Sequence, residues 1–333
     1  AFFIDFANWS PFLPYGVAGV FQGAAVVFFS YVGFDAVTTL AGEVENTKRD
    51  LPIGIVGTLT FVTMLYCAVS LVITGMLPYN QINVNAGLSD AFLQVGASYA
   101  SVIVGFGSVT TLSATTFASL LGQPRIFYQM AKDGLFFSLF AKLTKNGVPA
   151  IGTIVSGSFA LVFAFALTLG ELTDMISIGT LMAFAVVCAG VVILRHQDPN
   201  RPTDVPFLMA IYFVLCSLSA ISIIYRWPLW SIVVYAVPPI VIMFSFFLFR
   251  VVDVPQGFKT PLVPIVPCVG IYINLFLVFS LSPAALLRVI LWTVVGMLIY
   301  FSYSIRYSKQ GIYQSLLDKS LASAYGSLQQ TCF

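Results

Sequence analysis

A single carboxylate, Asp35, lies deep inside a long apolar stretch near the start of the chain. A charged side chain at the centre of a lipid bilayer costs about 2.5–3.5 kcal/mol on insertion scales, so such residues are rare there. They occur where the side chain faces the interior of a helix bundle or a water-filled cavity. Asp35 is therefore a first candidate for a functional group that binds or moves a polar solute.

The residues around Asp35 favour an interrupted helix. Gly33 permits backbone angles outside the α-helical region. Hydroxyl groups that can satisfy the backbone groups released by a break are supplied by Ser30, Tyr31, Thr38 and Thr39. Discontinuous helices at the middle of the bilayer build the binding sites of many secondary transporters. The alternative is an unbroken helix with Asp35 near its cytoplasmic end, in a structural hydrogen bond.

Two further polar clusters lie in apolar surroundings. The first is a hydroxyl-rich stretch with Ser108, Thr110, Thr111, Ser113, Thr115, Thr116 and Ser119. Such hydroxyls commonly serve helix packing in membranes, and the alternative is a polar wall along a substrate or ion route. The second is the segment 173–180, where Asp174 is expected in the first turn of a helix, favoured there by the helix dipole.

Enzymatic chemistry finds little support. The only histidine, His196, is expected in a cytoplasmic loop beside Arg195, and no second histidine exists to build a metal site. Four of the five cysteines lie in apolar runs, at spacings that match no metal or redox motif. No glycine-rich phosphate loop and no basic stripe for nucleic acid are present. We therefore expect no catalytic residues, no metal, no cofactor and no nucleic-acid partner. A channel is the other alternative to a carrier, and it would need rings of polar groups, normally from several symmetric subunits.

The elements that must position these residues are membrane helices. The chain has 333 residues, 59% hydrophobic and 8% charged, whereas soluble domains carry roughly 25% charged residues. Apolar runs near the roughly 20 residues that a crossing helix needs occur at 16–42, 53–77, 98–122, 149–170, 173–194, 207–226, 229–249, 263–282 and 285–305. The runs are continuous rather than alternating, which predicts an all-α bundle of about nine spanning helices.

The positions of lysine and arginine predict the orientation of this bundle. If the first helix runs from outside to inside, thirteen of the 15 basic residues lie on the cytoplasmic side, and only Arg226 and Arg288 lie outside. The C-terminus is then cytoplasmic, and the segments 78–97 and 171–174 are outer loops. In the cytoplasmic loop 123–148, the stretch 125–134 is either a short helix at the membrane surface or a solvated connector.

The segment 19–37 (GVFQGAAVVFFSYVGFDAV) resembles the sixth transmembrane helix of the cationic amino acid transporter family, within the amino acid–polyamine–organocation superfamily. The following EVENTKRDLPIGI at 43–55 resembles the next cytoplasmic loop of that family. QPRIFY at 123–128, KDGL at 132–135 and MISIGTL at 175–181 are similar to later family segments. The resemblance extends, in order, to about residue 310.

The resemblance implies part of a LeuT-like fold. Residues 1–194 would be helices six to ten, the second inverted repeat; residues 195–310 would be helices eleven to fourteen, and 311–333 a cytoplasmic tail. Helices one to five would be missing from this sequence. By resemblance the substrate-facing positions are Ser30, Tyr31, Gly33, Phe34, Val37 and, by its match to the family pattern, Asp35. Phe34 would close over the ligand, backbone carbonyls near Ser30 and Tyr31 would accept from its amino group, and Ser113 and Thr116 would be candidates on the facing helix.

These expectations define a multi-pass membrane protein that moves amino acids by alternating access. The resemblance favours cationic substrates such as arginine, lysine and ornithine, the lipid bilayer as surroundings and protons as the candidate coupling ion. It favours the plasma membrane, with a vacuolar or other internal membrane as the alternative. A second hypothesis is a non-transporting truncated form or a regulatory partner of a full-length transporter.

Overall fold

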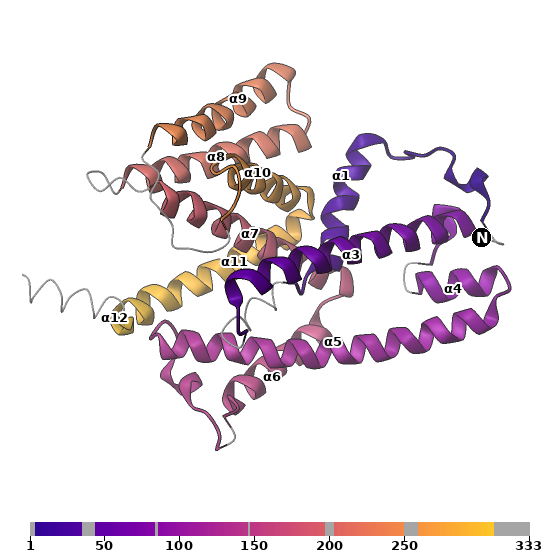
Figure 1. The fold of residues 1–333 in the computed structure, drawn as a ribbon, viewed down its shortest axis with the longest axis horizontal. Coiled ribbons are helices and arrows are strands. Elements are labelled where there is room, and N and C mark those ends of the chain that lie inside the picture. The colour runs from indigo at the N-terminus through magenta and orange to yellow at the C-terminus, as the bar shows by residue number, and fades with distance from the viewer. Residues whose placement is uncertain are drawn as a thin grey trace, which may run out of the picture. The chain divides into compact units, whose positions relative to one another are not determined.

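The computed structural model describes residues 4–34, 44–83, 86–145, 147–196, 203–249 and 259–309. All regular structure in these ranges is helical, as predicted (Figure 1). The α-helices are α1 (Gly16–Val27), α3 (Thr47–Met76), α4 (Gly87–Gln94), α5 (Ser98–Lys132), α6 (Ala150–Ala166), α7 (Leu169–Arg195), α8 (Asp204–Ile224), α9 (Leu229–Ser245), α10 (Ile265–Ser280), α11 (Pro283–Ile299) and α12 (Ile305–Tyr307). Short 3₁₀ helices are η1 (Phe6–Trp9), η2 (Phe28–Tyr31), η4 (Tyr79–Gln81), η5 (Ser138–Ala141) and η6 (Phe246–Leu248), and η7 (Tyr300–Ser304) is a π-helix.

Each predicted apolar run contains a helix, but the helices differ in length. Among the described residues, six are long and apolar enough to cross a bilayer: Thr47–Met76, Ser98–Lys132, Leu169–Arg195, Asp204–Ile224, Leu229–Leu248 and Pro283–Tyr307. Three are shorter apolar helices: Gly19–Tyr31, Ala150–Ala166 and Ile265–Ser280. The polytopic helical membrane architecture is confirmed, and the count of nine crossings stays a prediction.

Two predicted connections are wrong. The chain leaves α6 after Ala166 and enters α7 at Leu169, so the segment 171–174 is helix and not an outer loop. The predicted stretch 125–134 is neither a separate surface helix nor a connector, because α5 continues without interruption to Lys132 and only the last two residues form a turn. Pro124 is accommodated inside α5, where it lacks an N–H to donate to the helix, and its ring is buried.

The described residues form two compact units that alternate along the sequence. Unit 1 comprises described residues within 1–102 and 168–289, and unit 2 those within 103–167 and 290–333. The sequence predicted a boundary at residue 194, between an inverted repeat and the helices that follow it. The two units are defined by contacts and not by repeat symmetry, so this boundary stays a prediction.

The core of unit 1 is formed by α7, α8 and α10, with α9 packed on α8. Tyr212 is buried at the centre and donates from its hydroxyl to the backbone carbonyl of Cys268 at 2.9 Å. Small residues allow close approach: a Cβ placed on Gly270 would lie 3.3 Å from the sulfur of Cys188. Close packing through small residues is typical of helices in lipid.

A second apolar cluster in unit 1 holds α1 in place. Ala25 is completely buried against Ile178 and Leu181 of α7 and Val278 of α10. The anchored position lies only three residues before α1 gives way to η2 at Phe28. The end of α1 is therefore fixed by its neighbours.

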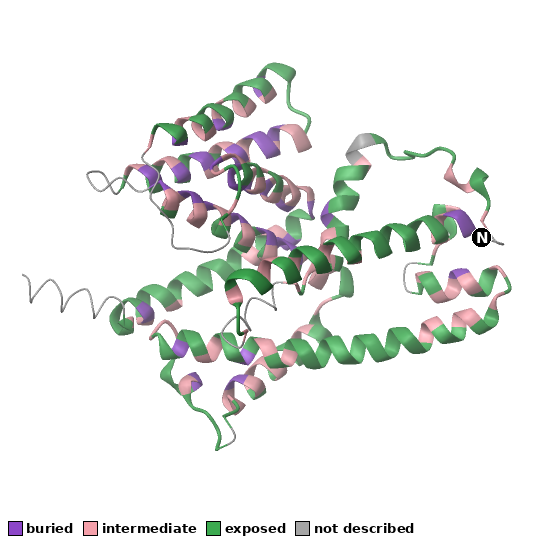
Figure 2. Cartoon of the chain, viewed as in Figure 1, coloured by how far each residue is buried: buried purple, intermediate pink, exposed green. Residues whose placement is uncertain are grey.

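Long helices of each unit also present broad exposed apolar faces. In unit 1, α3 is exposed along most of its length, and in unit 2 the same holds for α5 (Figure 2). Met64 of α3 is 65% exposed and Phe106 of α5 is 72% exposed. Apolar surface on this scale needs lipid or further helices to cover it.

Candidate functional site

The first α-helix, α1, ends inside its apolar run. The α-helix stops at Val27, and one 3₁₀ turn follows to Tyr31. Val32 has φ −62° and ψ 129°, an extended conformation, and Gly33 has φ +124°. The alternative of an unbroken helix through this segment is wrong for the described residues. Asp35 and Val37 lie outside the described residues.

Position 33 favours glycine because of its backbone angle and not because neighbouring atoms crowd it. A Cβ built on Gly33 would meet no atom within 4 Å. Its φ, however, lies where side chains of L-residues are strained and glycine is not. The sequence signal for a break was therefore a glycine, and the structure shows glycine at the point where the chain turns away from the helix.

Two side chains of α3 hold the broken segment. Tyr66 donates from its hydroxyl to the backbone carbonyl of Ser30 at 2.9 Å. Tyr31 donates to the hydroxyl of Thr63 at 3.2 Å, and the rings of Tyr31 and Tyr66 meet edge to face at 5.4 Å. Ser30 itself donates to the carbonyl of Val27 at 2.6 Å. Hydroxyl groups thus satisfy part of the backbone at the break.

Thr63 and Tyr66 were not among the predicted site residues. They lie three positions apart on α3, so they project from the same side of that helix. The same apolar run also carries the hydroxyls of Thr58, Thr60, Ser70 and Thr74, so the spacing alone does not single out this pair. Nor does the sequence reveal which helix they face.

Phe34 lies in an aromatic group with α7. Its ring is 5.4 Å from that of Phe184, which in turn lies 6.1 Å from the ring of Phe28 on the other side of the break. Phe34 is half-buried. Rings at these separations attract one another by about 0.5–1.5 kcal/mol beyond burial, so Phe184 supports the position of Phe34.

The hydroxyl cluster of α5 belongs to unit 2. Ser113 donates to the carbonyl of Val109 at 2.8 Å, and Thr116 to that of Leu112 at 2.8 Å. Both side chains are exposed, and both use their donors on their own helix. This is how hydroxyls are accommodated in apolar helices. The break lies in unit 1, so the substrate-facing role predicted for Ser113 and Thr116 stays a prediction.

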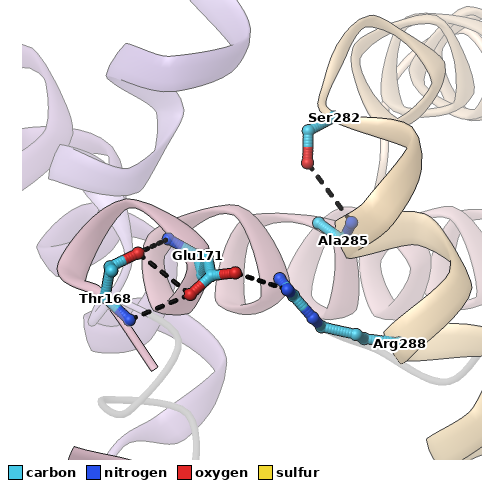
Figure 3. A network of polar contacts seen from close by, with 5 residues as sticks. All are labelled: Thr168, Glu171, Ser282, Ala285 and Arg288. Atoms are coloured by element: carbon cyan, nitrogen blue, oxygen red, sulfur yellow. Dashed lines mark hydrogen bonds and ion pairs between the residues drawn. The ribbon is translucent and has the colours of Figure 1, made fainter. Parts of the chain in front are cut away.

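An ion pair joins the start of α7 to α11 in unit 1 (Figure 3). Thr168 caps α7 through a capping box: Glu171 accepts from the backbone N–H of Thr168 at 3.0 Å and donates its own N–H to the threonine hydroxyl. The other carboxylate oxygen of Glu171 binds the guanidinium of Arg288. The acidic residue in the first turn is therefore Glu171; the placement predicted for Asp174 is wrong, because α7 begins at Leu169.

His196 also differs from its predicted environment. Rather than lying in an open loop, it caps the end of α7 and is 1% exposed. Its Nδ1 lies 3.0 Å from the carbonyl of Val192, and its ring is 6.3 Å from that of Phe246. Within the described ranges, no group of three or more His, Cys, Asp or Glu side chains could hold a metal ion.

In the described ranges, the chain is helical with several apolar spans, and one helix ends inside its apolar run; these are the features of a polytopic membrane protein. The family description "Amino acid permease" matches residues 1–249, and "C-terminus of AA_permease" matches residues 258–308. The chain belongs to the amino acid permease family. These matches confirm the resemblance inferred from the sequence motifs.

Similar proteins carry several substrate names. The chain is 36% identical to cationic amino acid transporter 9, chloroplastic, of Arabidopsis thaliana, over 91% of this chain and 56% of that protein. It is 32% identical to a methylthioribose transporter of Bacillus subtilis, over 90% and 54%. It is 30% identical to the branched-chain amino acid permease BcaP of the same bacterium, over 91% and 54%. The chain therefore spans little more than half the length of these relatives.

Proposed function

We propose that this chain forms half or more of a secondary-active carrier that moves amino acids by alternating access around the break at 28–34. The observation that carries this proposal is the end of the helix inside an apolar run, where the chain becomes extended at Val32 and turns at Gly33. A broken helix in a membrane exposes backbone polar groups that must line a cavity or bind a ligand. An amino acid carries an ammonium and a carboxylate, which such groups can recognise.

The geometry around the break suits this role. The carbonyl of Ser30 already accepts from Tyr66, and a carbonyl oxygen has a second lone pair for a ligand ammonium. Phe34 stands at the edge of the segment, supported by Phe184. We assign Ser30, Tyr31 and Gly33 to ligand contact through the backbone and Phe34 to closure over the ligand. Tyr66 and Thr63 act as positioning residues.

Preference for cationic amino acids is supported by relatives and by one side chain. Several similar proteins are named cationic amino acid transporters, while others are named for methylthioribose or branched-chain amino acids. Asp35, two residues after the turn at Gly33, is the carboxylate best situated in the sequence to attract a basic side chain. We propose arginine, lysine or ornithine as substrates, with protons as the coupling ion.

The proposed orientation is supported by the ion pair of unit 1. Glu171 and Arg288 can bind each other only if the starts of α7 and α11 lie on the same side of the membrane. The lysine and arginine distribution predicts the outer side for both. The pairing also explains how a basic residue is tolerated there, since Glu171 neutralises it. We propose that the C-terminus is cytoplasmic and that the membrane is the plasma membrane.

Uptake into proteoliposomes tests the proposal. Labelled arginine and leucine are offered to vesicles containing the product of the complete reading frame that encodes this chain. Gly33→Leu and Phe34→Ala are each expected to lower the initial arginine uptake rate by about tenfold or more, since misplaced ligand contacts commonly cost about 10²-fold. Asp35→Asn is expected to lower arginine uptake more than leucine uptake.

Matched substitutions on α3 control for general damage. A Cβ placed on Gly57 would meet no atom within 4 Å, and Phe61 is 64% exposed. Gly57→Leu and Phe61→Ala should therefore leave uptake near the unsubstituted rate. Equal uptake by the site variants and these controls would rule out the break as the site. Absence of any amino acid uptake would favour a non-transporting membrane protein.

A further inference from the structure

Two segments far apart in the sequence fold together in unit 2. The backbone N–H of Lys309 donates to the carbonyl of Asp133 at 3.1 Å. The hydroxyl of Ser304 donates to the carbonyl of Leu135 at 2.7 Å, and the hydroxyl of Tyr303 accepts from the backbone N–H of Ser138 at 3.3 Å. The end of α5 and the chain around α12 therefore share one surface.

The loop after η5 belongs to the same surface. The ring of Phe140 is buried and packs on those of Phe127 and Phe136, at 5.6 and 4.9 Å. This aromatic packing ties the loop that carries Lys142 and Lys145 to the end of α5. The loop itself is closed by Thr144, whose backbone N–H donates to the carbonyl of Val148 at 2.9 Å.

Five exposed basic side chains gather on this surface, which we call the basic face: Lys132, Lys142, Lys145, Arg306 and Lys309. Among the described residues, no carboxylate forms an ion pair with any of the five. Asp133, the acidic residue next to Lys132, is occupied by the side-chain amide of Gln129 at 3.1 Å. The Gln129 amide is neutral, so Asp133 keeps its negative charge. In the part of the chain that the structure describes, the basic face therefore carries five positive charges against this one carboxylate.

Apolar side chains are interleaved with these charges. Exposed fractions are 43% for Phe137, 50% for Leu139, 44% for Leu143, 52% for Ile305 and 57% for Tyr307. Alternating aromatic, aliphatic and basic side chains at the end of membrane helices are typical of the boundary between headgroups and hydrocarbon. A free phosphate ion would gain nothing from the apolar part, whereas a phospholipid matches both.

We propose that the basic face binds the headgroups of anionic phospholipids in the leaflet next to it. The charge is complementary, since basic residues near an anionic leaflet are attracted within a Debye length. The apolar side chains between them can enter the upper acyl region. Bound lipid would then hold the end of α5, the loop that carries Lys142 and Lys145, and α12 against one another.

Lipid retention measures this directly. The full chain is reconstituted in nanodiscs of phosphatidylcholine with a minor fraction of phosphatidylglycerol, released into mild detergent, and its retained lipids are counted by native mass spectrometry. The unsubstituted chain should retain phosphatidylglycerol in excess of its share. The triple variant Lys132→Gln, Lys142→Gln, Lys145→Gln should bind phosphatidylglycerol about a hundredfold more weakly, since each basic residue contributes roughly fivefold. Its retained phosphatidylglycerol should therefore fall to the share present in the nanodisc.

Three controls make the result decisive. A triple Lys→Arg variant at the same positions keeps the charge and should keep the enrichment. The triple variant Lys48→Gln, Arg49→Gln, Lys259→Gln removes equal charge from exposed positions of unit 1 and should also keep it. Equal loss in both glutamine variants, or no loss in either, would overturn the proposal. Displacement of the lipid by millimolar inorganic phosphate would instead show a simple anion site, and would likewise overturn it.

Discussion

At the scale of single residues, a few groups near the break determine what it can bind. Gly33 turns the chain, with φ +124°. Tyr66 and Thr63 hold the two residues before the turn from α3, and Phe184 supports Phe34 from α7. Because these contacts come from two different helices, the break is positioned by tertiary structure and not by its own sequence alone.

Removal of the Tyr66 hydroxyl should weaken substrate binding. In Tyr66→Phe the carbonyl of Ser30 loses its donor, and the backbone at the break is less well held. A hydrogen bond contributes a net of about 0.5–1.5 kcal/mol, so the KM for uptake should rise by about two- to tenfold. Tyr99→Phe, at a side chain that is 90% exposed, is the control and should leave KM unchanged. An unchanged KM in Tyr66→Phe would mean that Tyr66 does not position the site.

The sequence predicted one side of this site and not the other. Ser30, Gly33 and Phe34 could be selected because a glycine and hydroxyls stand out in an apolar run. Thr63, Tyr66 and Phe184 could not, because nothing in a local pattern states which helices pack together. Asp35 and Val37 remain predictions, as does the role of Ser113 and Thr116.

At the scale of elements, the close contact between the end of α5 and α12 depends on Gly134. Its φ is +79°, and a Cβ there would overlap the backbone carbonyl of Tyr307. Gly147 has a similar φ of +74° but open space around it. The two glycines therefore separate the cost of the backbone angle from the cost of the contact.

Gly134→Ala should destabilise the protein more than Gly147→Ala does. A non-glycine residue in the left-handed region costs on the order of 1 kcal/mol, a penalty common to both variants. Only Gly134→Ala must also push α12 away, which breaks the hydrogen bonds at Asp133 and Leu135. Thermal unfolding in detergent measures the difference. Equal melting temperatures for the two variants would show that α12 does not pack on this turn.

Element boundaries were predicted less well than element types. The end of α5 was missed because Pro124 and the basic residues after it are typical of a connector, yet the ring of Pro124 packs where Gly152 of α6 leaves room. The start of α7 was missed because Leu169 and Gly170 continue the apolar character of α6. In that case the capping pair Thr168 and Glu171, three residues apart, was the available signal.

At the scale of the whole molecule, hydropathy alone predicted the architecture, because lipid leaves few alternatives to helices.

The direction in which the chain crosses the membrane was predicted from the distribution of lysine and arginine, and it can be measured. Gln94→Cys, on α4, should react with a membrane-impermeant maleimide in intact cells. Lys145→Cys should react only after permeabilisation. Cys67 and Cys332 are first replaced by serine, since Cys67 is exposed and Cys332 lies in the predicted cytoplasmic tail. The reverse pattern of labelling would invert the orientation.

Binding of the substrate at the break at 28–34 is tested most directly by protecting a cysteine from labelling. Ser30→Cys is introduced into the same background, and its rate of reaction with a small thiol reagent is measured with and without saturating arginine. Arginine is expected to slow labelling of Ser30→Cys severalfold and to leave Gln94→Cys unaffected. Equal labelling rates of Ser30→Cys with and without a transported amino acid would contradict this location of the binding site.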